Sequence, residues 1–215
     1  MNTEKKNILI VGCGPGSEEY IIPAGRAAAL SADVLIVSQR LHSLFPESAA
    51  ERIDSGNDVE KGLQLIAARR AAGLQVCLLA TGDPGIASLA QPVIRRFGRE
   101  CCVVIPGISS VQVAFARLGL SWQEARIITA HSRNPRGTIE ELREAGKIAI
   151  LGGRPEALSW TAELIEKLDG KRRTFLCEDL TLPSERVREI TSAELAKLPT
   201  STRAIILIIK EEAFS

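Results

Sequence analysis

The sequence predicts an α/β protein with two domains, and three observations lead to this prediction. Short apolar runs alternate with helical patterns through the first half of the 215 residues. Turns rich in glycine and proline follow three of these runs, as they do where parallel strands end in ligand-binding sheets. The second half has apolar runs without long helices between the last of them, which favours a mixed sheet. We expect an N-terminal, mainly parallel sheet with helices on both faces, followed by a C-terminal mixed α/β sheet.

In the first half, each element is predicted from its local pattern. Apolar runs predict strands at residues 7–11, 34–37, 75–80 and 101–105. A helix is expected at 23–30, where proline occupies the first turn. Another is expected at 58–72, because its apolar residues recur at helical spacing. Two more helices are expected to end near Phe97 and near Gly119, where the glycine is a plausible C′ residue.

The segment 118–122 is the candidate domain boundary, so the predicted domains are 1–118 and 119–215. In the second domain a polar helix is expected to end near Glu144, and another is expected at 155–168, closed by Asp169 and Gly170. Strands are expected at 127–130, 147–151, 173–177, 186–190 and 204–209.

Composition excludes several classes of protein. Apolar residues make up 45% and charged residues 25% of the chain, which is typical of a globular protein and not of a disordered one. A net charge of +1 and an aromatic content of 4% argue against nucleic acid and anionic membrane as partners. No apolar run approaches the ~20 residues of a membrane span. The five cysteines show no C-x-x-C spacing, so we expect a cytoplasmic protein with no metal site.

The first glycine-rich loop, G-C-G-P-G-S at 12–17, is similar to a dinucleotide-binding fingerprint but departs from it. Ser17 stands where the third glycine belongs, and Pro15 removes a backbone donor. The acidic residue expected about 20 positions further on, Asp33, precedes the second strand instead of ending it. The loop is either a tight strand-to-helix turn or a segment that brings backbone close to a ligand.

The second and third loops follow the strands predicted at 75–80 and 101–105. In T-G-D-P-G at 81–85, Asp83 precedes Pro84 and can cap the next helix. In P-G-I-S-S at 106–110, one of the two serines, Ser109 or Ser110, can cap a helix as well. All three loops are also placed to line a ligand cleft, because parallel strands bring their carboxyl ends to one edge of the sheet.

Several motifs occur in an order that resembles one known family. In chain order they are G-C-G-P-G-S at 12–17, G-D-P at 82–84, P-G-I-S-S-V-Q-V-A-F-A-R-L-G-L-S-W at 106–122, H-S-R at 131–133 and C-E-D-L-T-L-P-S-E-R at 177–186. Together they resemble the tetrapyrrole methylases, S-adenosylmethionine-dependent enzymes with two α/β domains. Within that family the chain is similar to the CbiE-type branch, over residues 7–210.

The chain departs from the pattern of that branch at four places. Ser132 stands where the branch usually has glycine, and Asp179 where it usually has asparagine. Glycines at 152–153 replace a common acidic residue, and Ala-Ser at 87–88 replaces bulkier residues. These departures concern the substrate pocket more than the cofactor.

The resemblance implies a methyl donor, S-adenosylmethionine, held mainly by backbone. The matching positions are Pro15, Thr81, Gly82, Asp83, Ile86, Ser109, Ser110 and Leu151. A carbon methylation finally releases a proton, so Asp83, His131 and Glu178 are candidate bases, although His131 also suits a structural role. The substrate is expected to be a polycarboxylate macrocycle. Arg117, Arg133 and Arg154 are candidates to hold its carboxylates, with a solvated surface as the alternative for each.

The branch methylates carbon 5 of a (cobalt-)precorrin in cobalamin biosynthesis, and the resemblance implies this function here. Because the sequence ends at Ser215, only the C5 reaction is expected, with C15 left to a separate methyltransferase. A homodimer is expected from the relatives. The alternatives are another tetrapyrrole methylase, as in sirohaem synthesis, a ribosomal RNA methyltransferase, a nucleotide-binding module without catalysis, or a nicotinamide oxidoreductase.

Overall fold

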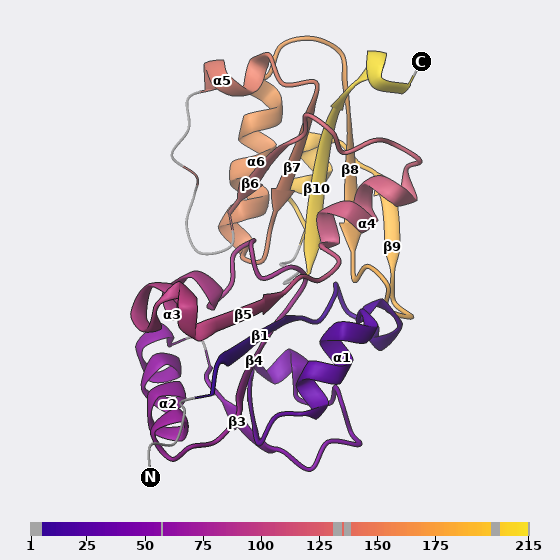
Figure 1. Cartoon of the computed structure of the whole chain (residues 1–215). Helices are drawn as coiled ribbons and strands as arrows, with labels where there is room; N and C mark the ends of the chain where they lie inside the picture. The colour runs from indigo at the N-terminus through magenta and orange to yellow at the C-terminus, as the bar shows by residue number, and fades with distance from the viewer. Residues whose placement is uncertain (1–5, 57, 131–134, 136–138, 199–202, 215) are drawn as a thin grey trace. The chain divides into compact units, whose positions relative to one another are not determined.

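The computed structural model describes residues 6–56, 58–130, 135, 139–198 and 203–214. The chain forms two compact units, Met1–Ser109 and Ser110–Ser215 (Figure 1). The division falls before helix α4 (Ser110–Arg117), whereas the sequence analysis places it after residue 118. The helix belongs to the second unit because it packs against strand β10 (Ala204–Lys210) of that unit.

The first unit is built on a five-stranded parallel sheet with strand order β3-β2-β4-β1-β5. The strands are β1 (Ile8–Gly12), β2 (Val34–Val37), β3 (Glu51–Asp54), β4 (Val76–Ala80) and β5 (Cys102–Ile105). Four of them are confirmed predictions. Edge strand β3 was not predicted, because its sequence E-R-I-D has a single apolar residue and owes its conformation to pairing with β2.

Helices cover both faces of this sheet, as predicted (Figure 1). They are α1 (Pro23–Leu30), α2 (Val59–Ala71) and α3 (Ala90–Phe97), with short 3₁₀ turns η1 (Glu18–Tyr20), η2 (Gln39–Leu41) and η3 (Arg99–Cys101). Alternate residues of β1 point to opposite faces, so Val11 packs with α1 while Ile8 and Ile10 pack with α2 and α3. This division of apolar side chains fixes the register of the central strands.

The second unit contains a mixed sheet with strand order β6-β7-β10-β8-β9, which confirms the predicted class. Its other elements are β6 (Arg126–Thr129), α5 (Ile139–Arg143), β7 (Lys147–Leu151), α6 (Pro155–Lys167), β8 (Arg172–Glu178), β9 (Arg186–Glu189), α7 (Ser192–Leu195) and η4 (Glu211–Phe214). Only β6 and β7 run parallel among these described strands. Ile148, Leu176 and Ile206 form a core with Leu158 and Leu164 of α6.

Within the described residues, no helix is long and apolar enough to span a membrane.

Candidate functional site

Three glycine-containing loops meet where the central strands of the first sheet end. Strands β4, β1 and β5 are neighbours and parallel, so the loops that follow them leave the same edge. A Cβ atom added to Gly12 would lie 2.4 Å from the Gly107 nitrogen and 2.8 Å from the Gly82 oxygen. The three backbones therefore touch, which explains why each loop carries a glycine at this point.

The first two loops are also joined by backbone hydrogen bonds. The Gly82 N–H donates to the Gly14 oxygen at 2.7 Å, and the Gly14 N–H donates to the Gly82 oxygen at 3.3 Å. Gly14 and Gly82 have φ values of +74° and +68°, which disfavour larger residues. The Gly14 N–H is thus engaged within the fold instead of facing a phosphate group.

Asp33 lies away from this edge of the sheet, at the start of β2. Its Oδ2 accepts from the Gln75 N–H at 2.7 Å and lies 3.3 Å from Lys6 Nζ, and the first of these bonds lowers the pKa of the carboxyl group. A ribose-binding acid would stand at the other end of the strand. This position does not support a dinucleotide site.

Asp83 connects the second loop to the third. Its Oδ1 accepts from the Gly85 N–H at 2.7 Å, and its Oδ2 accepts from the Gly107 N–H at 3.1 Å. The prediction that Asp83 caps the next helix is wrong, because α3 begins only at Ala90, after Leu89 as N-cap. The carboxylate instead accepts one hydrogen bond within its own turn and one from the loop after β5.

The other candidate donor-binding positions of the first unit lie on or beside these loops. Thr81 is exposed, Pro15 and Ile86 are half-buried, and Gly82 and Ser109 are buried. This edge of the sheet thus presents backbone and small side chains, which suits a ligand recognised by shape and a few hydrogen bonds. Ser110, the next position, begins α4 in the second unit.

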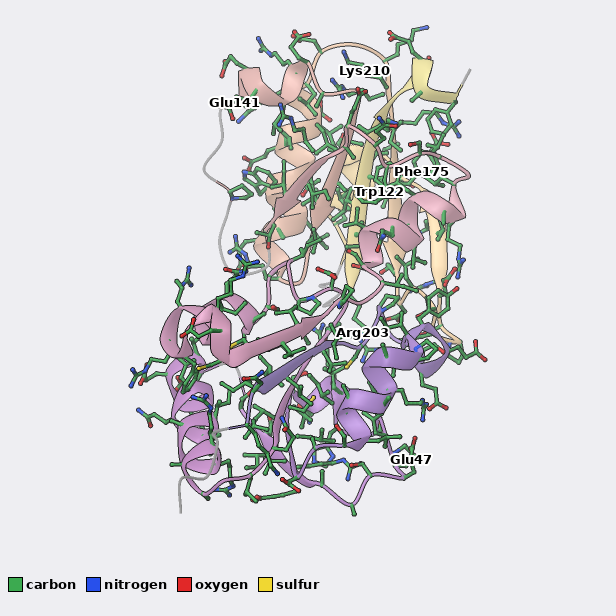
Figure 2. All side chains as sticks on the ribbon, in the orientation of Figure 1. Glu47, Trp122, Glu141, Phe175, Arg203 and Lys210 are labelled. Carbon is green, nitrogen blue, oxygen red and sulfur yellow. The ribbon has the colours of Figure 1, made fainter. Side chains whose placement is uncertain are left out.

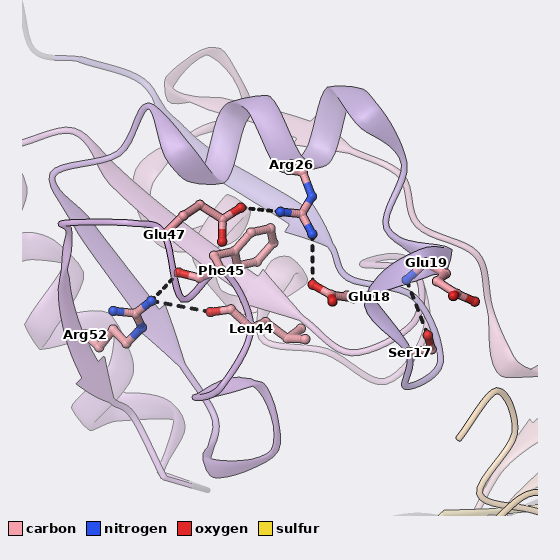
Figure 3. A network of polar contacts seen from close by, with 8 residues as sticks. All are labelled: Ser17, Glu18, Glu19, Arg26, Leu44, Phe45, Glu47 and Arg52. Carbon is pink, nitrogen blue, oxygen red and sulfur yellow. Dashed lines mark hydrogen bonds and ion pairs between the residues drawn. The ribbon is translucent and has the colours of Figure 1, made fainter. Parts of the chain in front are cut away.

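The segment after the first loop is tied to the segment after β2 through Arg26 of α1 (Figure 3). Arg26 Nη2 lies 3.0 Å from Glu18 Oε2, and Nη1 contacts Glu47 Oε1. The guanidinium carbon stands 5.7 Å from the ring centre of the buried Phe45, a cation–π contact. Arg26 therefore links two segments that leave the carboxyl edge of the sheet.

In the second unit, the candidates Leu151 and Glu178 lie at one end of the mixed sheet. Ile205 pairs with Leu151 of β7 on one side, and its neighbour Ala204 pairs with Glu178 of β8 on the other. Arg203 precedes these residues, and Lys210 marks the opposite end of β10 (Figure 2). The ends of β7 and β8 and the start of β10 thus bring Leu151 and Glu178 to the same edge of this unit.

Glu178 carries an unusual carboxylate. Its side chain is only 12% exposed, and Oε2 is buried without a hydrogen-bond partner among the described residues. Arg186 and Arg188 of β9 approach Oε2 at 3.7 and 3.9 Å, which is beyond hydrogen-bonding distance. A buried acceptor left open in this way is costly, and such groups are typical of functional sites.

Two of the candidate substrate-binding arginines are engaged within the second unit. Arg117 pairs with Glu185 through two contacts, Nε to Oε1 at 2.5 Å and Nη2 to Oε2 at 3.1 Å. Arg154 Nε donates to the Ala130 oxygen at 2.9 Å. Both cations are therefore anchored by a partner within the unit, although Arg117 is exposed to solvent.

Sequence reasoning missed Glu185 as a site residue, although the motif at 177–186 contains it. Its Oε2 also accepts from the Thr181 N–H at 2.5 Å. Thr181 has a φ of +70°, rare for a β-branched residue, so Arg117 and Glu185 together hold a strained turn. The hydrogen bond from Arg117 is the main reason why the pKa of Glu185 is lowered. The predicted roles of His131 and Arg133 concern positions outside the described residues.

Fold and loops together define a class: an α/β protein of two units whose first sheet carries three glycine-containing loops in contact at its carboxyl edge. The family model for tetrapyrrole (corrin/porphyrin) methylases matches residues 7–196, and the chain belongs to this family. The resemblance and the predicted class of enzyme are thereby confirmed, since the family consists of S-adenosylmethionine-dependent methyltransferases.

Three known proteins illustrate the relationship. A cobalt-precorrin-7 C(5)-methyltransferase of Salmonella typhimurium is 32% identical over 181 residues, which are 84% of this chain and 88% of that protein. The crystal structure of a precorrin-6Y methylase (CbiE) from Archaeoglobus fulgidus has a TM-score of 0.72 at 28% identity, covering 95% of this chain and 98% of the other. A uroporphyrin-III C-methyltransferase from Thermus thermophilus, complexed with S-adenosylhomocysteine, shares the fold, with a TM-score of 0.79 at 19% identity over 94% and 97% of the two chains.

Proposed function

We propose that this protein transfers a methyl group from S-adenosylmethionine to carbon 5 of a (cobalt-)precorrin in cobalamin biosynthesis. The observation that carries the proposal is the sequence similarity to the cobalt-precorrin-7 C(5)-methyltransferase of Salmonella typhimurium, which extends over most of both chains. The CbiE structure from Archaeoglobus fulgidus supports the same branch. Because the Salmonella relative is named for C5 alone and is matched over 88% of its length, we assign C15 methylation to a separate enzyme.

The residues of the first unit fit the methyl donor. The donor combines an uncharged adenosine, a sulfonium and an amino acid, and when bound it supplies an electrophilic methyl group. Pro15, Thr81, Gly82 and Ile86 offer the backbone and small surfaces that such a ligand needs, and Pro15 is acceptable because no diphosphate has to be held. Gly82 allows close approach, since among the described residues an added Cβ meets only the Ser109 Cα within 4 Å, at 3.9 Å.

For the second unit we propose roles in substrate binding and proton removal. Leu151, at the end of β7, is proposed as a donor-binding residue from the resemblance alone, and Glu178 is proposed to accept the proton released when C5 is methylated. The buried Oε2 of Glu178 supports this role, because it accepts no hydrogen bond in the described part of the fold. Arg117 and Arg154 are proposed to meet substrate carboxylates while anchored by Glu185 and Ala130. His131 and Arg133 remain proposed as base and carboxylate ligand from the motif alone.

We further propose a cytoplasmic homodimer. All five cysteines are free, which fits a reducing compartment. Edge strand β5 exposes Val103 and Val104, and apolar residues on an unpaired edge favour association with a second copy. Light scattering on the purified protein would measure a mass of twice 23.2 kDa if this holds, and a monomeric mass at micromolar concentration would contradict it.

The test of the function has two arms. Calorimetric titration with S-adenosylhomocysteine, with NADH as the control ligand, examines the class: binding of the former alone is expected. Incubation with cobalt-precorrin-7 and donor carrying a ¹³C-labelled methyl group then examines the position by NMR. A new methyl signal on C5 is expected. Transfer to uroporphyrinogen III instead would assign the chain to another tetrapyrrole reaction, and binding of NADH alone would overturn the methyltransferase proposal.

A further inference from the structure

We propose that Asp83 is a positioning residue of the methyl-donor site: its carboxylate holds the loop after β5 against the loop after β4, and it does not act as the base. This inference rests on the proposed function, because it assigns a role within the site that the donor would occupy. It separates Asp83 from Glu178 and His131, with which the sequence analysis groups it as a candidate base.

The geometry of the carboxylate carries the proposal. Each oxygen accepts a different backbone N–H, Oδ1 from Gly85 at 2.7 Å and Oδ2 from Gly107 at 3.1 Å. The first bond closes a turn within the loop after β4. The second crosses to the loop after β5, 24 residues further along the chain. Asp83 is thus a side chain that joins two of the three loops by a charge-assisted hydrogen bond.

The packing of the three loops shows what the Asp83–Gly107 bond holds together. An added Cβ on Gly107 would lie 2.2 Å from the Gly82 oxygen and 2.7 Å from the Gly12 Cα, so the third loop is packed directly on the other two. Van der Waals attraction between backbones opposes separation only weakly for each atom pair and has no preferred direction. The Asp83–Gly107 bond adds a directional contact between the two loops, and it therefore fixes the backbone positions that a ligand at this edge would meet.

The same geometry argues against a role for Asp83 as the catalytic base. A proton transferred to either oxygen weakens that oxygen as an acceptor for the N–H it already receives. Proton uptake by Asp83 would therefore loosen the turn or the contact between the loops in each catalytic cycle. Glu178 differs in its hydrogen bonding, because its Oε2 accepts no hydrogen bond among the residues described and is approached only by the ion pairs with Arg186 and Arg188.

Two variants separate the roles. Asp83→Asn keeps the shape but offers one acceptor oxygen, so an amide NH₂ would face a backbone N–H. Asp83→Ala removes both bonds. We expect the Kd for S-adenosylhomocysteine to rise about tenfold or more in Asp83→Ala, with Asp83→Asn in between, because charge-assisted bonds to two loops are lost. At saturating donor, kcat should stay within about threefold of the wild type, since a positioning residue acts through binding.

A matched control exists in the same unit. Asp54 Oδ1 accepts from the Gly56 N–H at 2.7 Å, which reproduces the Asp83–Gly85 turn without the bond to another loop. Asp54→Ala should leave the Kd for S-adenosylhomocysteine unchanged. A comparable loss in Asp54→Ala would mean that general destabilisation, not the link to Gly107, explains the effect.

Hydrogen exchange supplies a readout that does not need the ligand. Asp83→Asn should speed exchange of the Gly107 amide, measured by NMR, while strand amides of β1 keep their protection. Unchanged exchange at Gly107 would overturn the proposal, even if Asp83→Ala fails to fold. So would a large fall in kcat at unchanged Kd, which is the signature of a base. If the wild type itself fails to bind S-adenosylhomocysteine, the proposed function fails, and the exchange result still decides whether Asp83 holds Gly107.

Discussion

Gly107 packs so closely against Gly82 that a Cβ atom on Gly107 would lie 2.2 Å from the Gly82 carbonyl oxygen. Real Cβ atoms do not approach backbone oxygens at this distance, so Gly107→Ala must displace a loop. We expect this variant to lose about 1–3 kcal/mol of unfolding free energy and most of its affinity for S-adenosylhomocysteine. Urea denaturation and calorimetry measure the two effects.

Gly146→Ala is the matched control for that experiment. A Cβ on Gly146 meets no atom of the described residues within 4 Å, so the unfolding free energy should change by less than about 0.5 kcal/mol and donor binding should not change. If both substitutions change stability and donor binding equally, the contact with Gly82 is not the reason why position 107 requires glycine.

The ion pair between Arg117 and Glu185 should make stability depend on pH. The folded pKa of Glu185 is lowered, chiefly by Arg117, so its contribution is present above the unfolded carboxyl value and is lost as pH falls through the folded value. Arg117→Ala should therefore cost about 1 kcal/mol at pH 7, and the difference from wild type should vanish as pH falls through the lowered pKa of Glu185. Thermal unfolding from pH 2.5 to 7 measures this dependence.

A double-mutant cycle provides the control. If the pair is the cause, Arg117→Ala should have little effect in a Glu185→Gln background. A pH-independent penalty in both backgrounds would instead indicate that Arg117 contributes through packing of its aliphatic stem.

The five thiols should fall into two groups of reactivity. Burial raises the pKa of Cys13 and of Cys177 to about 12 and raises the pKa of Cys77 above the ordinary thiol range. Thiolate is the reactive form, so these three should resist Ellman's reagent at pH 8 in the native protein. Only Cys101 and Cys102, which are half-buried, should react, and Cys102 slowly because burial raises its pKa. All five should react in guanidinium chloride.

A variant lacking both half-buried thiols, with Cys101→Ser and Cys102→Ser, checks the assignment. Its native form should show no fast reaction. A fast thiol remaining in that variant would mean that one of the three core cysteines is transiently exposed.

The contacts of Arg26 should stabilise the first unit locally. Arg26→Ala removes ion pairs to Glu18 and Glu47 and the contact with the Phe45 ring, so we expect a loss of about 1 kcal/mol of unfolding free energy. Substitution of the exposed Arg95 on α3 is the comparison and should change stability by less than about 0.5 kcal/mol. Since surface ion pairs are screened, added salt should reduce the difference between the two variants. A salt-independent difference would assign the effect to the aromatic contact.

The sequence by itself determined the fold class, the central strands and the three loops. These features depend on local signals. Apolar runs predict β1, β2 and β4, and glycines mark positions where a tight turn or a close backbone contact excludes larger residues. The same motifs were sufficient to indicate the family, because they are themselves local sequence patterns.

Only the tertiary structure decided how individual side chains are used. Asp83 was expected to cap a helix but bonds across to Gly107, and Arg117 was found paired with Glu185. Strand β3 forms because its backbone pairs with β2. Helix α4 is part of the second unit because it packs against β10. Each of these outcomes depends on a partner distant in sequence. A local pattern carries no information about such a partner until the chain has brought the two together.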